Sequence, residues 1–159
     1  MGFQMRFLHN LKVWLSPPKM TDPDFGNLTF MHIGKHPERS YWECEWMFPP
    51  TGTVVGITLL GGETGPENDA RQFYLGLPAR FDSILTSCRP RLEQVFRDWR
   101  GGHVPQDVFT AVKLTGLGLE NPQEQPIRWD VGFESTDGDW LAITIPFVGD
   151  TPKEPLVDT

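Results

Sequence analysis

The chain has 159 residues, of which 38% are hydrophobic, 12% aromatic and 22% charged. This composition is typical of one folded domain with its own core, and it excludes an intrinsically disordered chain. Two cysteines, Cys44 and Cys88, are too few for a disulfide framework and favour a reducing, cytoplasmic location. No run of 18 apolar residues occurs, so we expect no integral membrane association.

The net charge of −7 comes entirely from the last quarter of the chain. Residues 1–119 contain twelve basic and twelve acidic side chains, whereas residues 120–159 contain two basic and nine acidic ones. A neutral body with an acidic end disfavours nucleic acid as a partner and favours a basic protein partner. Ordinary solubility charge would produce the same count, and this alternative stays open.

Residues 1–20 are predicted to form an N-terminal helix followed by a linker. One helical stripe carries the apolar residues Phe7, Leu8, Leu11, Trp14 and Leu15. Such a stripe favours a short helix docked on the body of the protein, and a helix on a membrane surface is the alternative. Polar residues interrupt the apolar run, so we expect no secretory signal.

Three strands are predicted next, over residues 25–33, 40–48 and 53–62. The middle one lies in SYWECEWMFPP (40–50), which looks at first like a catalytic or metal site. Its residues alternate, and successive strand side chains point to opposite faces. We therefore expect Glu43 and Glu45 on one face, opposite the inward-facing residues Trp42, Cys44, Trp46 and Phe48.

The apolar spacing becomes helical over residues 64–99. Thr64 and Glu67 have the spacing of a capping box at the start of this region. Pro78 and Pro90 are predicted to divide the region into separate helices, because proline removes a backbone donor and clashes with the preceding turn. Gly101 follows where a C-terminal cap belongs.

Three more strands are predicted over residues 107–119, 127–135 and 139–149, and Asp137-Gly138 indicates a hairpin between the last two. Residues 151–159 are predicted to be a flexible tail after a single domain spanning 21–150. The expected fold class is α+β, with element order α-βββ-αα-βββ. A mostly antiparallel sheet of about six strands would carry the helices on one face.

No nucleotide or metal site has a coherent pattern, so we predict no cofactor and no metal. GGETGP (61–66) lacks the phosphate-loop frame and its lysine. His32 and His36 have helical ligand spacing, but Gly34 and Pro37 disfavour a helix there, and Cys44 belongs to the strand. The segment 137–139 is too short for a calcium loop.

No catalytic residue is predicted either. Cys88 with His103 would suit a nucleophile and base, but Cys88 lies on the apolar stripe of a helix, where free cysteine is usually inert. Glu43 and Glu45 would lie about 7 Å apart on a strand, a separation that suits glycosidase carboxylates. No subsite motif accompanies them, so we favour a protein that is not an enzyme.

The middle of the chain resembles a group of small bacterial domains of unknown function. The resemblance rests on DPDFGNLTF, YWECEWMFPPTG, the GGETGP turn and ARQFYLGLPARFDSIL, and it covers residues 22–99. Some members of such groups are encoded beside toxins and are thought to be immunity proteins. The resemblance implies a protein that neutralises a toxin by tight binding, and it carries over no functional residue.

Two other functions remain open: a type III secretion chaperone that binds an effector, and an enzyme with an unrecognised site. We expect a monomer or weak dimer with a basic protein partner. The predicted partner surface is the acidic hairpin, made of Glu134, Asp137, Asp139 and Trp140. There a tryptophan anchor lies beside steering charges. Packing of Trp140 under its own hairpin is the competing interpretation.

Overall fold

The structure, a computed structural model, describes residue 9 and residues 11–159. Phe7 and Leu8 of the predicted N-terminal stripe lie outside the described residues. Residues 11–15 are helical, and Val13 is the residue of this segment that enters the core. The stripe residues Leu11, Trp14 and Leu15 are exposed, so the docked face differs from the predicted one.

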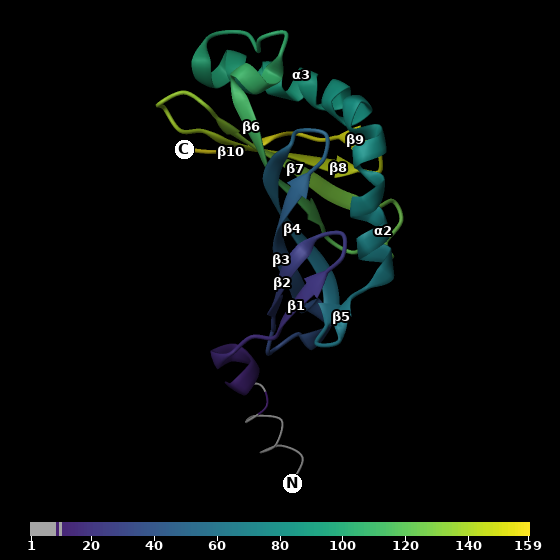
Figure 1. Cartoon of the computed structure of the whole chain (residues 1–159). Coiled ribbons are helices and arrows are strands. Elements are labelled where there is room, and N and C mark those ends of the chain that lie inside the picture. Colours follow the sequence, from purple (N-terminus) through teal and green to yellow (C-terminus); the bar gives the residue numbers. More distant parts are fainter. Residues whose placement is uncertain (1–8, 10) are drawn as a thin grey trace.

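A single mixed sheet forms the body of the protein (Figure 1). Its ten strands are β1 (Lys19–Asp22), β2 (Gly26–Met31), β3 (Tyr41–Phe48), β4 (Thr53–Gly62), β5 (Gly65–Pro66), β6 (Val112–Leu119), β7 (Arg128–Ser135), β8 (Ala142–Val148), β9 (Thr151–Pro152) and β10 (Leu156–Asp158). Their spatial order is β1-β2-β3-β4-β6-β7-β8-β10, with β5 paired to β4 and β9 paired to β8. All pairings are antiparallel except that of β4 with β6.

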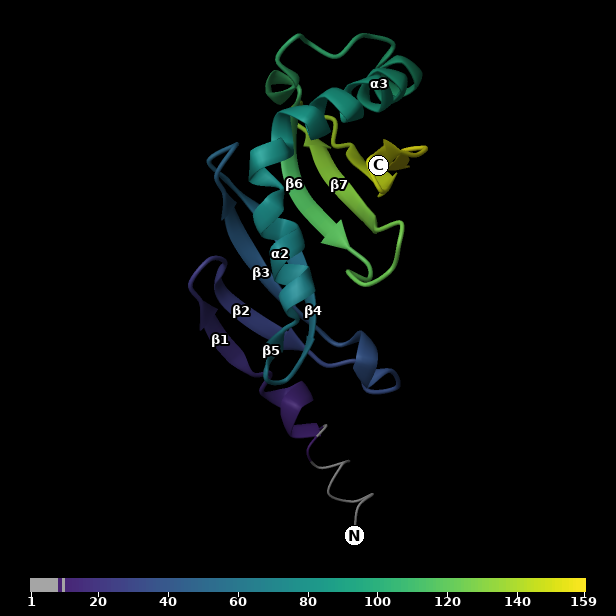
Figure 2. The same cartoon turned by 90° about the vertical axis from the view of Figure 1, so that its right-hand side faces the viewer.

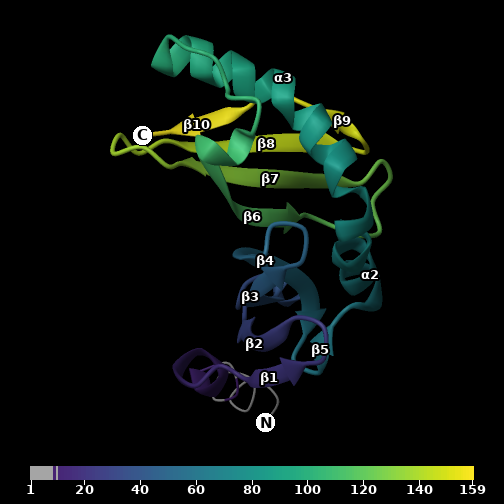
Figure 3. The same ribbon diagram turned by 45° about the horizontal axis from the view of Figure 1, so that its top comes forward.

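The helices lie in the connection between β4 and β6 and cover one face of the sheet (Figure 2). They are α2 (Asn68–Gly76) and α3 (Phe81–Arg100), accompanied by the short 3-10 helices η2 (Pro78–Arg80) and η3 (Val108–Thr110), whereas a further 3-10 helix, η1 (Pro37–Arg39), lies between β2 and β3. Parallel neighbours require such a crossover, because a tight hairpin reverses the chain direction. The sheet therefore consists of two antiparallel halves, β1–β4 and β6–β10, that meet at one parallel seam (Figure 3).

The α+β class and the mostly antiparallel sheet are confirmed, but the predicted number of about six strands and the predicted order α-βββ-αα-βββ are wrong. Four strands were not expected: β1 between the predicted N-terminal helix and the first predicted strand, the two-residue β5, and β9 and β10 in the predicted flexible tail. These are short strands that pair through backbone groups. They carry too few residues to show the alternation by which longer strands are recognised.

The helical region also differs from its prediction. Pro78 does end α2, but Pro90 lies inside a continuous α3. A helix-interior proline costs about 3 kcal/mol, and a long buried stripe offsets this cost: Phe81, Ile84, Cys88, Leu92, Val95 and Phe96. Thr64 does not cap α2, whose N-cap is Glu67 without a side-chain hydrogen bond. Gly101 caps α3 in the left-handed conformation, as expected.

The alternation of β3 is confirmed residue by residue. Trp42, Cys44, Trp46 and Phe48 are buried beneath the helices, and Glu43 and Glu45 are exposed on the opposite face. The same alternation runs through β2, β4, β7 and β8. The opposite face of the sheet therefore carries polar side chains and glycines where the core face carries aromatic and aliphatic ones.

Candidate functional site: the open face of the sheet

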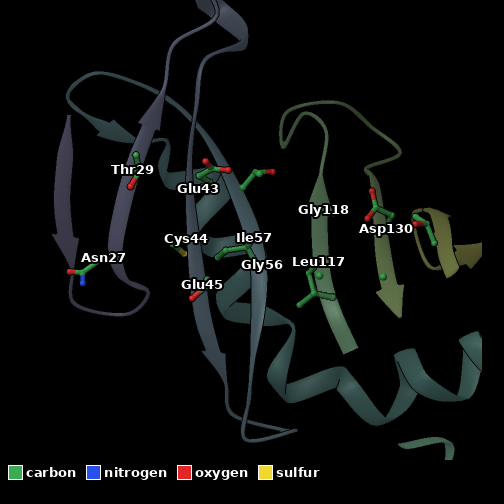
Figure 4. Close-up of a pocket in the computed structure, with 14 residues that line it drawn as sticks. Asn27, Thr29, Glu43, Cys44, Glu45, Gly56, Ile57, Leu117, Gly118 and Asp130 are labelled. Carbon is green, nitrogen blue, oxygen red and sulfur yellow. The ribbon is translucent and has the colours of Figure 1, made fainter. Parts of the chain in front are cut away.

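Within the described part of the chain, no helix lies on the sheet face opposite α2 and α3, which we call the open face (Figure 1). A shallow depression of about 810 Å³ is hollowed into it where the two halves of the sheet meet, and we call it the seam depression (Figure 4). Its lining residues are Asn27, Thr29, Glu43, Cys44, Glu45, Gly56, Ile57, Thr58, Gly116, Leu117, Gly118, Asp130, Gly132 and Thr144.

The seam itself is a short pairing between long strands. β4 has ten residues and β6 has eight, yet only Gly56 with Gly116 and Ile57 with Leu117 are in register. From the helix side, the hydroxyl of Tyr74 lies 2.8 Å from the Thr58 carbonyl oxygen and 3.2 Å from that of Leu117. Burial raises the pKa of Tyr74 well above its usual value, so the hydroxyl remains a donor.

Three glycines form the floor of the seam depression. Gly56 pairs with Gly116, and Gly116 pairs with Gly132, so one row without side chains crosses three neighbouring strands. Glu45 stands beside Gly56 at one end of the row, and Thr144 stands beside Gly132 at the other. The missing side chains of the row leave the backbone of the seam open to solvent-side contacts.

The backbone does not require glycine at these three positions. None of them has a positive φ. An added Cβ at Gly56, Gly116 or Gly132 would meet its nearest neighbour at 3.5–3.7 Å, which is ordinary van der Waals contact. Glycine inside a strand costs stability relative to residues that have a side chain. The glycine floor is therefore a feature that the sheet tolerates and does not need.

Gly118 differs from the floor glycines, because the Asp130 carboxylate occupies the space where its Cβ would lie. An added Cβ would sit 2.7 Å from Oδ2 of Asp130, closer than real contacts allow. Burial, followed by the negative charge of Glu120, raises the pKa of Asp130. The missing side chain of Gly118 thus lets a half-buried carboxylate lean toward the seam.

Acidic side chains stand on both sides of the floor. Glu43 and Glu45 project from β3, and Asp130 projects from β7 (Figure 4). The described lining residues include no lysine, arginine or histidine. Cys44 is also a lining residue, but its side chain belongs to the buried face of β3, and burial raises its pKa to about 12, so it is not a thiolate nucleophile at neutral pH.

The predicted partner hairpin is divided between two environments. Glu134 lies on the open face of β7, two residues beyond Gly132, and its carboxylate is 3.1 Å from the Lys113 ammonium. Asp137 and Asp139 each lie 3.3 Å from the guanidinium of Arg100 on α3. Trp140 is 50% exposed. The structure therefore joins Glu134 to the face that holds Asp130, while Arg100 pairs with both aspartates and offsets part of their charge.

Arginines of the helical layer also pair with two further acidic residues of the last quarter. Asp150 lies 3.0 Å from Arg80, and Glu154 lies 2.8 Å from Arg91. Acidic residues that cluster at the end of the sequence therefore lie beside basic residues of the helices in the folded protein. The acidic groups that line the seam depression come from both halves of the chain, and sequence counting did not single them out as one surface.

A sequence signal for the depression does exist. In their strands, four glycines take positions whose side chains would point away from the core: Gly56, Gly116, Gly118 and Gly132. Their common location depends on the parallel pairing of β4 with β6, which joins segments about sixty residues apart. From the sequence alone, nothing indicates that these four glycines of three different strands lie side by side.

The other candidate residues of the sequence are not brought together. His36 contacts Glu38 at 3.2 Å, and His103 contacts Glu93 at 3.4 Å, both at the surface. Cys88 is fully buried in the core, where burial raises its thiol pKa to about 12. Among residue 9 and residues 11–159, no group of three or more His, Cys, Asp and Glu side chains is placed to hold a metal ion.

The remaining findings concern membrane-spanning helices and the similarity of this chain to known proteins. None of the described helices combines the length and apolar character that crossing a membrane requires. The open face, with its glycine floor and flanking carboxylates, is the most distinctive feature of the described surface. No protein-family model, curated protein or solved structure matches this chain.

Proposed function

We propose that this protein is a non-catalytic binding protein that holds a basic protein partner on its open face. Most specifically, it acts as a bacterial immunity protein that neutralises a toxin by tight binding. The observation that carries the proposal is the concave, uncovered sheet face with carboxylates on both sides of a glycine floor. Acidic surfaces of this kind accelerate association with basic proteins and select against acidic ones.

The open face also supplies apolar contacts. Met47 and Val54 stand opposite each other on β3 and β4, and they are 57% and 47% exposed. Protein interfaces typically combine such apolar groups with a polar, charged surround. The proposed interface includes the acidic hairpin, because Glu134 continues the open face of β7 toward the half-exposed Trp140. Tryptophan at such a place is a frequent binding anchor.

The resemblance of residues 22–99 to domains encoded beside toxins supports the same proposal. Two buried free thiols, Cys44 and Cys88, suit a reducing compartment, and we place the protein in the cytoplasm. Neutralisation by binding needs a specific surface and no nucleophile. The open face has the former, and the thiol of the buried residue Cys44 stays protonated at neutral pH.

The test begins with capture of the partner from the source bacterium by the tagged full-length chain. We expect a basic protein that forms a one-to-one complex in light scattering and arrests growth when expressed alone. Co-expression of this chain should restore growth. Glu43→Lys with Glu45→Lys should abolish rescue, whereas Glu124→Lys, in the exposed 120–127 loop, should leave it intact.

Other results would contradict the proposal. A stable homodimer that binds an unfolded effector segment would identify a secretion chaperone instead. Turnover of a small substrate at the seam depression would identify an enzyme. Equal rescue by the wild type and the double lysine variant would remove the open face from the interface.

A further inference from the structure

We propose that the seam depression binds an arginine side chain from an extended segment of the partner, with the guanidinium over the floor formed by Gly56, Gly116 and Gly132. This inference rests on the proposed function, and it specifies the chemistry of the partner group that the open face receives. Three observations support it: an unfilled floor, unmatched carboxylates, and the shape of the space between them.

The floor is space that the sheet could have filled. Side chains at Gly116 and Gly132 would make ordinary contacts at 3.5 Å, and the backbone at both positions is accessible to any residue. Residues with side chains would stabilise central strands better than glycine does. Glycine at three positions in one row instead permits close approach of a foreign group to the backbone.

Among the described residues, the carboxylates around the floor have no basic partner, in contrast to the acidic residues Asp137, Asp150 and Glu154. Arg80, Arg91 and Arg100 each meet an acidic residue of the last quarter within 3.3 Å. Within the described part of the chain, no salt bridge involves Glu43, Glu45 or Asp130. An incoming cation would supply the missing charge from outside.

The shape of the space favours arginine over lysine. Neighbouring strands lie about 4.8 Å apart, so a row of three glycines makes a floor about 10 Å wide. A planar guanidinium can lie flat on such a floor and donate in its own plane to carboxylates on two sides. It is also less strongly hydrated than an ammonium, which matters beside a half-buried carboxylate such as Asp130.

The first experiment uses a defined peptide and the full-length protein. Acetyl-Ser-Gly-Arg-Gly-Ser-amide is titrated into ¹⁵N-labelled protein, and peptides with citrulline or lysine in place of arginine are titrated in parallel. We expect saturable shifts of the Gly56, Gly116, Gly118 and Gly132 amide signals with the arginine peptide. Citrulline, which keeps the shape and loses the charge, should bind about tenfold more weakly or not at all.

Variants then distinguish the contribution of the glycine floor to peptide binding from the contribution of nonspecific negative charge. Gly116→Ala and Gly132→Ala should weaken arginine-peptide binding about tenfold while the urea midpoint stays equal to that of the wild type or rises. Asp130→Asn should also weaken binding. Glu124→Gln removes the same charge from the exposed 120–127 loop and should change affinity by less than about twofold.

Several outcomes would overturn the inference. They are equal binding of arginine and citrulline peptides, tighter binding of the lysine peptide, shifts confined to the hairpin, and equal weakening by Glu124→Gln and Asp130→Asn. A lower urea midpoint for both alanine variants with unchanged peptide affinity would show that the glycines serve the fold alone.

The experiments test the arginine site and the proposed immunity function independently of each other. If the captured toxin complex forms and Gly116→Ala leaves its dissociation constant unchanged, the arginine site is wrong and the binding function stands. If the arginine peptide binds selectively but no growth-arresting partner exists, the immunity function is wrong and the docking site stands.

Discussion

The hydroxyl of Tyr74 donates a hydrogen bond of 2.8 Å to the carbonyl oxygen of Thr58. The same hydroxyl lies 3.2 Å from the carbonyl of Leu117 on the facing strand, at the point where β4 and β6 cease to pair. Since Tyr74 is fully buried on α2, one side chain joins the helical layer to the backbone that underlies the seam depression.

Tyr74→Phe should lower the free energy of unfolding by about 1–2 kcal/mol. The change leaves the ring in place and removes the donor from two carbonyl oxygens beneath the seam. Urea unfolding followed by fluorescence measures the loss. Tyr41→Phe, at the only other tyrosine, is the control and should change stability by less than about 0.5 kcal/mol. Equal losses for the two variants would show that the Tyr74 hydroxyl has no special role.

Gly118→Ala should be less stable than Gly116→Ala by about 0.5–1.5 kcal/mol, because the new methyl group meets the Asp130 carboxylate at 2.7 Å and must displace this side chain from its rotamer. Gly116→Ala is the matched control on the same strand, where the added methyl meets only ordinary contacts. Calorimetric melting of both variants checks the difference. If the Gly118→Ala and Gly116→Ala variants are equally stable, the Asp130 carboxylate can leave its position without cost.

Trp46→Ala should cost about 3–5 kcal/mol, because the indole is buried and packs edge-on against Phe25 and Phe48, with ring centroids 5.1 Å away in both cases. Glu43→Gln with Glu45→Gln should cost about 0.5 kcal/mol or less for each residue, because both side chains are exposed. Urea melts of the two variants distinguish the faces of β3. Severe loss from the double glutamine change would contradict the assignment of these glutamates to a binding surface.

Asp130→Asn should stabilise the protein at neutral pH, and the gain should disappear on acidification. Burial and the charge of Glu120 raise the pKa of Asp130 in the folded state above its unfolded value. The folded state therefore binds the proton more tightly, and stability falls as pH rises through the interval between the two values. Above that interval the ionised carboxyl is a net cost that asparagine avoids.

Unfolding free energies of the wild type and Asp130→Asn at pH 7 and below pH 4 test this expectation. The difference should be largest at pH 7 and close to zero once Asp130 is protonated in both states. A variant that is less stable than the wild type at pH 7 would show that the ionised carboxylate is held by favourable contacts.

Local patterns predicted the long elements well. The alternation of β3 and β4 follows from the chemistry of neighbouring residues. A hairpin does connect β7 to β8, but β8 begins at Ala142 and Gly138 has no positive φ, so Asp137-Gly138 lies in a longer connection and not in a tight two-residue turn. Pro90 shows the limit of such reasoning, because the buried face of α3 outweighs the local preference of proline to end a helix.

The edge strands were not predicted, because local sequence patterns do not show which distant segments pair. β1 and β10 are held by backbone pairing to β2 and β8, and this pairing leaves little trace in side-chain pattern. The acidic hairpin was found in the sequence, but its neutralisation by Arg100 was not, because the two segments lie 37–39 residues apart.

The sequence by itself determined the α+β class, the buried face of β3 and the net acidity, because these depend on composition and on short-range periodicity. Only the tertiary structure decided where a binding surface lies. The parallel pairing of β4 with β6 places Gly56 beside Gly116, and it sets the glutamates of β3 across the seam from Asp130 of β7. Such a surface depends on which distant strands become neighbours, and that choice is made by packing of the helical layer on the opposite face.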